Sequence, residues 1–245
     1  MEEENKIEMI KLSASSVKTY ESCQLKYYWT YIDKKPKKQW EHFSLGNFCH
    51  KVLENFHSDL INDKELDKAQ LMKKYFEEAR ISFKLKDASL IEAKQMLSSY
   101  LRNYNNASNV LYVEKAFTFT LDNNIVIRGF IDRLDKIDDT YHIIDYKTSK
   151  DAKYMNPFQL KVYGIWLRKE FGIKNYKGSY IMLRNNSQLI SYDFSEQDID
   201  DCEQELIAYA NKIKESTILQ NWEPIPTFLC KYCDFNSFCP TQKSW

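Results

Sequence analysis

Apolar residues in the first half of the chain recur at the spacing of an α-helix. Within residues 45–61 they fall three or four positions apart, which places them on one helical face. Residues 13–32 also have helical character, and Ser13 or Ser15 is suited to cap that helix. Residues 64–105 are charged and lack glycine and proline, which favours two further helices. The first half is therefore predicted to be helical.

From residue 110 the pattern changes to the alternation of apolar and polar positions that is typical of a β-strand. Turn residues separate the first three alternating stretches: Asp122-Asn123-Asn124 and then Asp138-Asp139-Thr140. The predicted strands are 110–121, 125–137, 141–148, 176–184 and 188–194.

Two helices are predicted among and after these strands. Asn156-Pro157 is suited to begin a helix that ends at Phe171. Ser195 and Asp198 have the spacing of a helix cap, and the helix they begin is expected to run to about Glu215. Helices, a meander, a crossover helix and more strands predict an α/β fold with a mixed central sheet flanked by helices. A chain of 245 residues is long enough for one large domain, and we expect a single domain over residues 1–245.

Charge gives no hint of a partner, because Lys+Arg and Asp+Glu each number 35. An anionic partner would therefore have to be bound by a local basic patch. The one dense basic run surrounds Pro36 and also fits an ordinary solvated loop. It consists of Lys34, Lys35, Lys37 and Lys38.

Several functional classes are disfavoured. The chain has only 5 glycines and no G-x-G-x-x-G or Walker-type sequence, so ATP-driven chemistry is not expected. Its first residues are acidic and lack the apolar core of a signal peptide. No apolar run approaches the length needed to cross a bilayer. We expect no membrane partner and a cytoplasmic location.

Charged residues interrupt two neighbouring predicted strands. Strand 125–137 places Asp132 on the same face as Val126, Phe130 and Leu134, where a carboxylate is costly unless it is paired or binds a metal. On the next strand, Asp145 and Lys147 are two residues apart and so point to the same side. Each residue alone also fits a salt-bridged strand end. Together, two carboxylates and a lysine are what metal-assisted phosphodiester hydrolysis needs.

Other polar residues are weaker candidates. His50 lies at the margin of the apolar stripe of its helix, and Gln159 and Tyr163 share a helical face at i, i+4. Each of these three also fits an ordinary packing or solvent role. Glu54 and His57 form the Glu-x-x-His step of di-iron carboxylate proteins, but no second step exists, so a di-iron site is rejected.

Four of the six cysteines have the spacing of metal ligands. Cys230, Cys233 and Cys239 form Cys-x2-Cys-x5-Cys, and Cys23 is a candidate fourth ligand. In a reducing compartment such clusters indicate a metal or iron–sulfur centre before they indicate disulfides. Cys49 and Cys202 are expected to be buried small side chains.

In this order, these motifs resemble the PD-(D/E)XK nuclease superfamily, specifically its RecB-like branch with an iron–sulfur cluster. The resemblance spans about residues 12–240 and rests on the ordered set, since no single motif is specific. The matching motifs are Ser13 or Ser15 through Cys23 and Tyr27-Tyr28, Gly46 with His50, Gly129 with Asp132, Asp145 with Lys147, Gln159 with Tyr163, and the cysteine tail.

The resemblance implies a restriction-endonuclease-like fold and a role for each motif. His50, Asp132 and Asp145 would coordinate Mg²⁺ or Mn²⁺, with the Tyr146 carbonyl as a further ligand and Lys147 as the catalytic lysine. Gln159 and Tyr163 would contact substrate phosphate or the lysine, and Glu114 would be an auxiliary acid. Cys23, Cys230, Cys233 and Cys239 would ligate a [4Fe–4S] cluster, with zinc as the alternative. Residues 60–108 would be a helical insertion over the site.

By the same resemblance we expect a metal-dependent deoxyribonuclease, an exonuclease that acts on DNA ends or single-stranded DNA in repair or recombination. Two departures from the family pattern stand out: Asp145 replaces the commoner glutamate, and no helicase portion is present. The protein would therefore act alone or be recruited by partners such as a helicase or CRISPR adaptation proteins. The alternatives are a CRISPR adaptation nuclease that trims prespacers and a catalytically inactive DNA-binding subunit.

Overall fold

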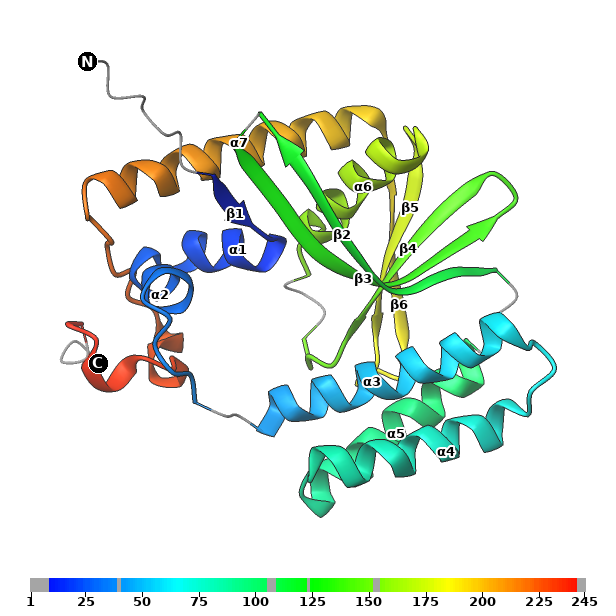
Figure 1. Ribbon diagram of the computed structural model, residues 1–245. Helices are drawn as coiled ribbons and strands as arrows, with labels where there is room; N and C mark the ends of the chain where they lie inside the picture. The colour runs from blue at the N-terminus through cyan, green and yellow to red at the C-terminus, as the bar shows by residue number, and fades with distance from the viewer. Residues whose placement is uncertain (1–8, 39–40, 105–108, 123, 152–154, 242–245) are drawn as a thin grey trace. The chain divides into compact units, whose positions relative to one another are not determined.

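The computed structural model describes residues 9–38, 41–104, 109–122, 124–151 and 155–241 (Figure 1). The chain divides into two compact units. Unit 1 comprises residues 1–38, 118–129 and 200–245, and unit 2 comprises residues 39–117 and 130–199. The prediction of one nuclease domain over the whole chain stays a prediction.

A six-stranded mixed sheet confirms the predicted fold class. The strands run in the order β1-β3-β4-β5-β6, and β2 also pairs with β3. Their bounds are β1 Ile10–Leu12, β2 Val110–Leu121, β3 Ile125–Ile137, β4 Thr140–Lys147, β5 Tyr176–Met182 and β6 Gln188–Phe194. The five predicted strands are therefore confirmed to within two residues at each end. The three-residue β1 was not predicted, because three positions are too few to show an alternation.

In unit 1, β1 lies parallel to the first part of β3, with Ile10 opposite Ile125 and Leu12 opposite Ile127. The helix that follows β1 is not continuous over residues 13–32 as predicted. It consists of α1 (Ala14–Ser22), α2 (Gln24–Tyr27) and a π-helical turn (Tyr28–Ile32). The break has a local cause: Cys23 is extended and its Sγ accepts a hydrogen bond from the Lys26 amide, so the thiol caps a new helix.

The C-terminal part of unit 1 follows α7 (Glu196–Ile218), which ends three residues later than predicted. The tail contains two short 3₁₀ helices, Phe228–Tyr232 and Asn236–Phe238. Phe235 anchors this tail, because its side chain is fully buried and its ring packs against Trp29 at 5.4 Å between centroids. Tyr27 stacks on Trp222 in the same unit.

In unit 2, three helices cover one face of the sheet and one covers the other (Figure 1). The first three are α3 (Glu41–Asn62), α4 (Lys68–Phe83) and α5 (Asp87–Asn103), as the sequence predicts. Their apolar faces share one core with Ile144 and Tyr146 of β4 and with Ile181 of β5.

The opposite face carries α6 (Phe158–Phe171), the crossover between the parallel strands β4 and β5. This helix ends as predicted, since Gly172 adopts a left-handed conformation with φ of 69°. Close approach of α6 to β5 depends on Gly164, because a Cβ there would overlap the ring of Tyr176. Asp145 and Lys147 face this side of the sheet, toward Gln159 of α6.

The α7 start confirms the predicted cap. The Ser195 amide donates to the Asp198 carboxylate, and this bond, with those from the Ser195 hydroxyl and Lys161, lowers the pKa of Asp198 to about 2. Within the described residues, no helix combines the length and the hydropathy that crossing a bilayer would require.

Candidate functional site

Three side chains of unit 2 form a group that could hold a metal ion. His50 of α3, Glu114 of β2 and Asp132 of β3 each offer one ligand atom, and these atoms lie within 4.8 Å of one another. No other set of three or more potential ligands is this close in the described part of the chain. The structure thus brings His50 and Asp132 together, and it places Glu114 with them.

His50 contacts both neighbouring strands. Its Nε2 lies 3.0 Å from the Tyr146 carbonyl oxygen and its Nδ1 lies 3.4 Å from Oδ2 of Asp132. Because a carbonyl can only accept, Nε2 carries the proton in this contact. Burial disfavours the imidazolium, yet the carboxylates of Asp132, Asp145 and Glu114 outweigh it and raise the pKa of His50 to about 9.

Packing explains why glycine stands at the first position of the Gly-x3-His motif. A Cβ at Gly46 would lie 3.2 Å from Oγ1 of Thr148, so a larger residue would crowd that hydroxyl at the end of β4. Gly46 therefore allows the first part of α3 to approach β4 closely, and His50 lies one helical turn further on.

Glu114 has an unusual backbone. Its φ of 45° is left-handed, which is rare for a residue with a side chain and marks an irregularity within β2. Burial, followed by the repulsion from Asp132, raises the pKa of Glu114 to about 7. A strained residue that brings a carboxylate toward a second one is typical of a functional site.

Asp145 and Lys147 lie on one side of β4, as predicted. Nζ of Lys147 is 2.6 Å from Oδ2 of Asp145 and 2.9 Å from Oε1 of Gln159. The amide of Gln159 in turn donates to the hydroxyl of Tyr163. Four of the predicted site residues thus form one polar chain that links β4 to α6.

The two carboxylates of the sheet are close to each other. Arg133 lies opposite Ile144 in the β3–β4 register, so Asp132 and Asp145 follow next on the two strands. Oδ2 of Asp132 accepts the Tyr146 amide at 2.8 Å. Burial raises the pKa of Asp145 to about 6 and Asp132 adds to the shift, although Lys147 opposes it. Asp145 pairs with Lys147 and is not a member of the close His50–Glu114–Asp132 group.

The expectation of an apolar face on β3 is wrong in the first part of the strand. Phe130 is 60% exposed, and the buried side chains there are Ile125, Ile127 and Ile131 of the opposite face. Asp132 itself is buried, at 8% exposure. The expectation failed because alternation in the sequence does not tell which of two apolar faces is covered.

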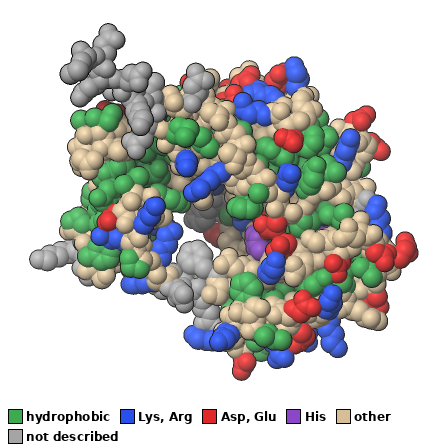
Figure 2. Space-filling view, viewed as in Figure 1, with side chains coloured by type: hydrophobic (Ala, Val, Ile, Leu, Met, Phe, Trp, Pro, Cys, Tyr) green, Lys and Arg blue, Asp and Glu red, His purple; other side chains and the backbone are tan. Residues whose placement is uncertain are grey.

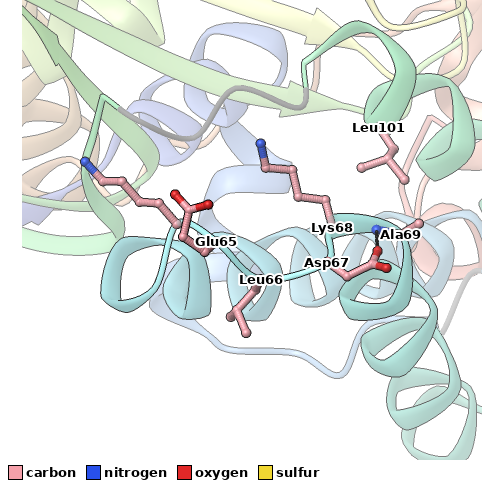
Figure 3. Close-up of a pocket in the computed structure, with 7 residues that line it drawn as sticks. Glu65, Leu66, Asp67, Lys68, Ala69 and Leu101 are labelled. Atoms are coloured by element: carbon pink, nitrogen blue, oxygen red, sulfur yellow. Dashed lines mark hydrogen bonds between the residues drawn. The ribbon is translucent and has the colours of Figure 1, made fainter.

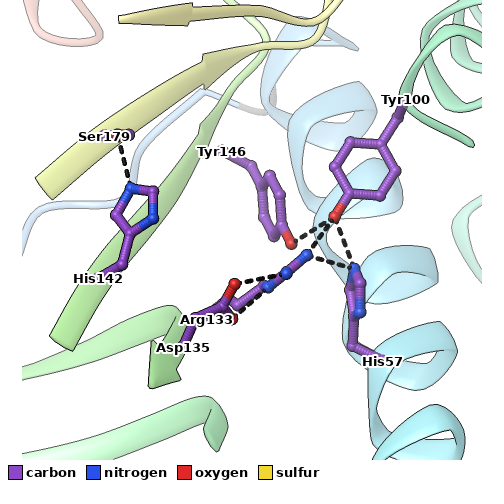
Figure 4. Close-up of polar contacts among 7 residues, drawn as sticks. All are labelled: His57, Tyr100, Arg133, Asp135, His142, Tyr146 and Ser179. Carbon is purple, nitrogen blue, oxygen red and sulfur yellow. Dashed lines mark hydrogen bonds and ion pairs between the residues drawn. The ribbon is translucent and has the colours of Figure 1, made fainter. Parts of the chain in front are cut away.

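A buried polar network lies beneath the site, on the α3–α5 face (Figure 4). The guanidinium of Arg133 makes two bonds of 2.6 Å to Asp135 and donates to the Tyr100 hydroxyl. That hydroxyl also contacts Nε2 of His57 and the hydroxyl of Tyr146. Burial, assisted by Arg133, lowers the pKa of His57 well below its usual value, so the imidazole is neutral.

This network was missed by the sequence reasoning. The available signal was Arg133 and Asp135 at i, i+2 in a strand that is otherwise largely apolar. His57, the residue of the rejected di-iron step, belongs to this network. Tyr146 joins the two layers, because its backbone contacts His50 and Asp132 while its side chain contacts Tyr100.

The four predicted cluster cysteines lie in unit 1 and all are free thiols. They line one cavity of about 400 Å³, whose other lining residues include Trp29 and Tyr232. No three of their sulfurs lie within 4.8 Å of one another in the described structure, so they form no tight cluster. Cys49 and Cys202 are buried, as predicted.

One further depression holds no group of candidate metal ligands among the described residues. A shallow depression at the α3–α4 turn is lined by Glu65, Leu66, Asp67 and Lys68, but Asp67 is engaged in capping α4 (Figure 3). Acidic and basic side chains are interspersed over the face shown in Figure 2, in keeping with the equal numbers of the two charges.

Comparison with solved structures supports the fold. The crystal structure of a "putative exonuclease" from Eubacterium rectale is similar to this chain, with a TM-score of 0.57 and 15% sequence identity. The similarity covers 94% of this chain and 88% of that one. At this identity the likeness concerns the fold alone.

Sequence comparison supports the family. The Gene 69 protein of Mycobacterium phage D29 is 27% identical over 137 residues, which cover 54% of this chain. The match spans about half of that relative, 48% of its length. Residues 11–240 match the family profile of the PD-(D/E)XK nucleases, nearly the whole chain. The chain belongs to the PD-(D/E)XK nuclease superfamily.

Proposed function

We propose that the protein is a metal-dependent deoxyribonuclease that removes nucleotides from DNA ends or single-stranded DNA. The single observation that carries this proposal is the convergence of His50, Glu114 and Asp132, with Asp145 and Lys147 on the adjacent strand. Superfamily membership supports phosphodiester hydrolysis. Exonuclease action, the choice of metal and the residue roles are the finer parts of the proposal.

The donor set fits a hard divalent cation. Carboxylates, one imidazole and a backbone carbonyl are ligands of Mg²⁺ or Mn²⁺ rather than of a thiophilic metal. In octahedral Mg²⁺ with bonds of about 2.1 Å, adjacent ligands lie about 3.0 Å apart. Nδ1 of His50, the ring nitrogen that faces Asp132, lies 3.4 Å from Oδ2 of that residue, close to this separation. We propose His50, Asp132, Asp145 and the Tyr146 carbonyl as ligands, with Glu114 as auxiliary.

When bound, the cation would neutralise phosphate charge and lower the pKa of a water molecule. The protein's part is to hold the carboxylates at fixed positions and to supply a cation of its own. The side chain of Lys147 is 27% exposed, and its ammonium is held by Asp145 and Gln159. Held in this way, it can stabilise the charge that develops on the phosphate in the transition state without reorganisation. Gln159 and Tyr163 then act by orienting Lys147 or by contacting phosphate.

We further propose that Cys23, Cys230, Cys233 and Cys239 hold a [4Fe–4S] cluster with a structural role. All four line one cavity, which supports a shared ligand. In a closed tetrahedral zinc site with Zn–S bonds of about 2.3 Å, the sulfurs would be about 3.8 Å apart. In the described structure no three of these sulfurs lie within 4.8 Å of one another, so the choice between zinc and iron–sulfur rests on metal analysis. Iron and zinc analysis of anaerobically purified protein decides, since a colourless protein with stoichiometric zinc ends the cluster proposal.

The cellular role is proposed more broadly. Repair or recombination, with a helicase as partner, is one context, and trimming of prespacers with CRISPR adaptation proteins is the other. A catalytically inactive DNA-binding subunit is disfavoured because His50, Asp132, Asp145 and Lys147 are all present and close.

Digestion of end-labelled linear DNA and of circular single-stranded DNA tests the proposal. We expect the wild-type protein to degrade linear DNA with Mg²⁺ or Mn²⁺, to spare the circle and to be inactive in EDTA. Asp132→Ala should abolish digestion, whereas Asp139→Ala, which changes an exposed turn residue, should not. Equal activity of Asp132→Ala and wild type would remove the proposed site, and rapid cleavage of the circle would overturn exonuclease action.

A further inference from the structure

A second cavity of unit 1 combines cations with exposed apolar side chains. It encloses about 710 Å³, within the range typical of ligand sites. Four separate elements or segments contribute one cation each. These cations are Lys11 of β1, Lys34 after the π-helical turn, Arg128 of β3 and Lys214 of α7.

The fold fixes two of these cations on one side of the sheet. Lys11 lies opposite Val126 in the parallel β1–β3 pair, and Arg128 is two residues beyond Val126. Side chains two residues apart share a face, so Lys11 and Arg128 project to the same side. Both are exposed, while Leu12 and Ile127 of the other side are buried.

The third cation follows an irregular segment. Tyr31 and Ile32 end the π-helical turn, and Lys34 has a left-handed φ of 54°. Short π-helical turns occur frequently at functional sites. The acid that precedes Lys34, Asp33, pairs with Lys35 at 2.7 Å.

The charged residues that line the cavity are all positive, although the chain has no net charge. Its described lining residues include four cations and no aspartate or glutamate. The whole chain has 35 residues of each charge, so this concentration is local. It is the kind of local basic patch that an overall neutral protein needs to bind a polyanion.

Apolar and aromatic side chains complete the lining. Met9 is 59%, Ile32 46% and Ile218 80% exposed. The half-buried ring of Tyr31 lies 5.0 Å from that of Tyr27, between centroids. Single-stranded nucleic acid offers both phosphates for the cations and unstacked bases for apolar and aromatic surfaces. A duplex offers the phosphates while its bases remain stacked on one another.

We propose that this cavity is a binding site for single-stranded nucleic acid, separate from the residues of the candidate metal centre. Lys11, Lys34, Arg128 and Lys214 bind successive phosphates, and Tyr31 with Ile32 contacts the bases. The biological purpose of this site rests on the proposed function, because a nuclease of single strands or ends benefits from holding the strand at a second site. It does not rest on hydrolysis itself.

Fluorescence anisotropy with a labelled oligothymidine of about 16 nucleotides, in EDTA, tests the site. Lys11→Glu/Arg128→Glu should weaken binding at least about tenfold and reduce the slope of log K against log salt by about 1.4. Lys73→Glu/Lys94→Glu makes the same charge change at exposed positions outside the cavity and should leave both unchanged. Tyr31→Ala should weaken binding of the single strand and not of a duplex. Circular dichroism and melting temperature establish that each variant is folded.

Three results would overturn the proposal. The first is wild-type affinity of Lys11→Glu/Arg128→Glu for the oligothymidine, and the second is an equal loss of affinity for duplex and single strand. The third is that this variant loses affinity for vesicles of anionic lipid while its affinity for the oligothymidine is unchanged. Hydrolysis of bis(p-nitrophenyl) phosphate, a small diester that needs only the metal centre, separates this proposal from the proposed function. The cavity variants should hydrolyse it at the wild-type rate. If the wild-type protein does not hydrolyse it while the variants still lose strand binding, the nuclease proposal fails and the binding site stands.

Discussion

The Nε2 atom of His50 lies 3.0 Å from the carbonyl oxygen of Tyr146. This contact joins α3 to β4 at the position where Asp132 also binds the Tyr146 amide. The side chain of Tyr146 points to the opposite face and contacts the Tyr100 hydroxyl. One residue thus connects the candidate metal centre to the buried network, and its neighbours Asp145 and Lys147 are held in place by the same strand.

Lys147→Ala should abolish DNA cleavage while DNA binding largely survives. We propose that its ammonium, which is held by Asp145, stabilises charge in the transition state, so its loss should lower kcat by at least about 10²-fold and change Kd little. Single-turnover cleavage and anisotropy on the same DNA measure the two quantities. Lys174→Ala, at an exposed ion pair with Glu196, is the control and should behave as wild type. Parallel loss of binding and cleavage would reduce Lys147 to a general electrostatic role.

Glu114→Gln should weaken metal binding before any substrate is present. The amide keeps the shape but removes one negative charge from the group formed with His50 and Asp132, so we expect Mn²⁺ to bind about tenfold more weakly. Calorimetric titration with Mn²⁺ measures this. Glu54→Gln, whose carboxylate pairs with Lys51, serves as the control. An unchanged Mn²⁺ affinity would remove Glu114 from the site.

Arg133→Met should destabilise the protein strongly. Asp135 is 4% exposed and would remain buried without its bidentate partner, at a cost of about 3–5 kcal/mol. Urea unfolding measures the free energy. The double variant Arg133→Met/Asp135→Leu removes both charges and should recover most of that loss. If the single variant unfolds like wild type, the network contributes no stability.

His142 should make stability depend on pH. Burial lowers the pKa of His142 to about 4, and its Nε2 contacts the Ser179 hydroxyl at 2.7 Å. In the unfolded chain the imidazole of His142 takes up a proton near pH 6.5, whereas in the folded protein it stays neutral down to about pH 4. The free energy of unfolding is therefore unaffected by this group above pH 6.5 and decreases as the pH falls toward 4. By linkage the loss is on the order of 3 kcal/mol. His142→Gln should flatten the curve of unfolding free energy against pH in this interval. A variant curve that runs parallel to the wild-type curve would show that His142 does not cause the pH dependence.

Cys233→Ala should lower the melting temperature of anaerobically purified protein and reduce its iron content. The reason is that the C-terminal segment would lose a ligand that ties it to the region of Cys23. Cys202→Ala changes a buried cysteine outside that cavity and should leave the iron content unchanged. An unchanged melting temperature in Cys233→Ala would contradict a structural role for a bound centre.

The sequence predicted best the elements in which the hydrophobic pattern repeats many times. Strands β2 to β6 and helices α3 to α7 each repeat their pattern often enough to be read. The break at Cys23 was not predicted because it depends on one hydrogen bond from the Lys26 amide to a thiol. β1 was missed since its three residues are defined by their pairing with β3 and not by their own pattern.

The site residues were predicted from order and spacing, and the structure brings His50 close to Asp132 and Lys147 close to Asp145. The network of Arg133, His57 and Tyr100 could not be predicted from the sequence, because its members are up to 76 residues apart and each alone has an ordinary packing explanation. The left-handed φ of Glu114 is likewise invisible in the sequence, since glutamate gives no backbone signal.

A crystal grown with Mn²⁺ tests the central claim most directly, through the anomalous signal of the ion. We predict a peak bonded to a ring nitrogen of His50 and to a carboxylate oxygen of Asp132, at about 2.0–2.2 Å from each. Saturating Mn²⁺ that gives no peak between these two side chains, or a peak bound only elsewhere, would contradict the proposed centre and the nuclease mechanism built on it.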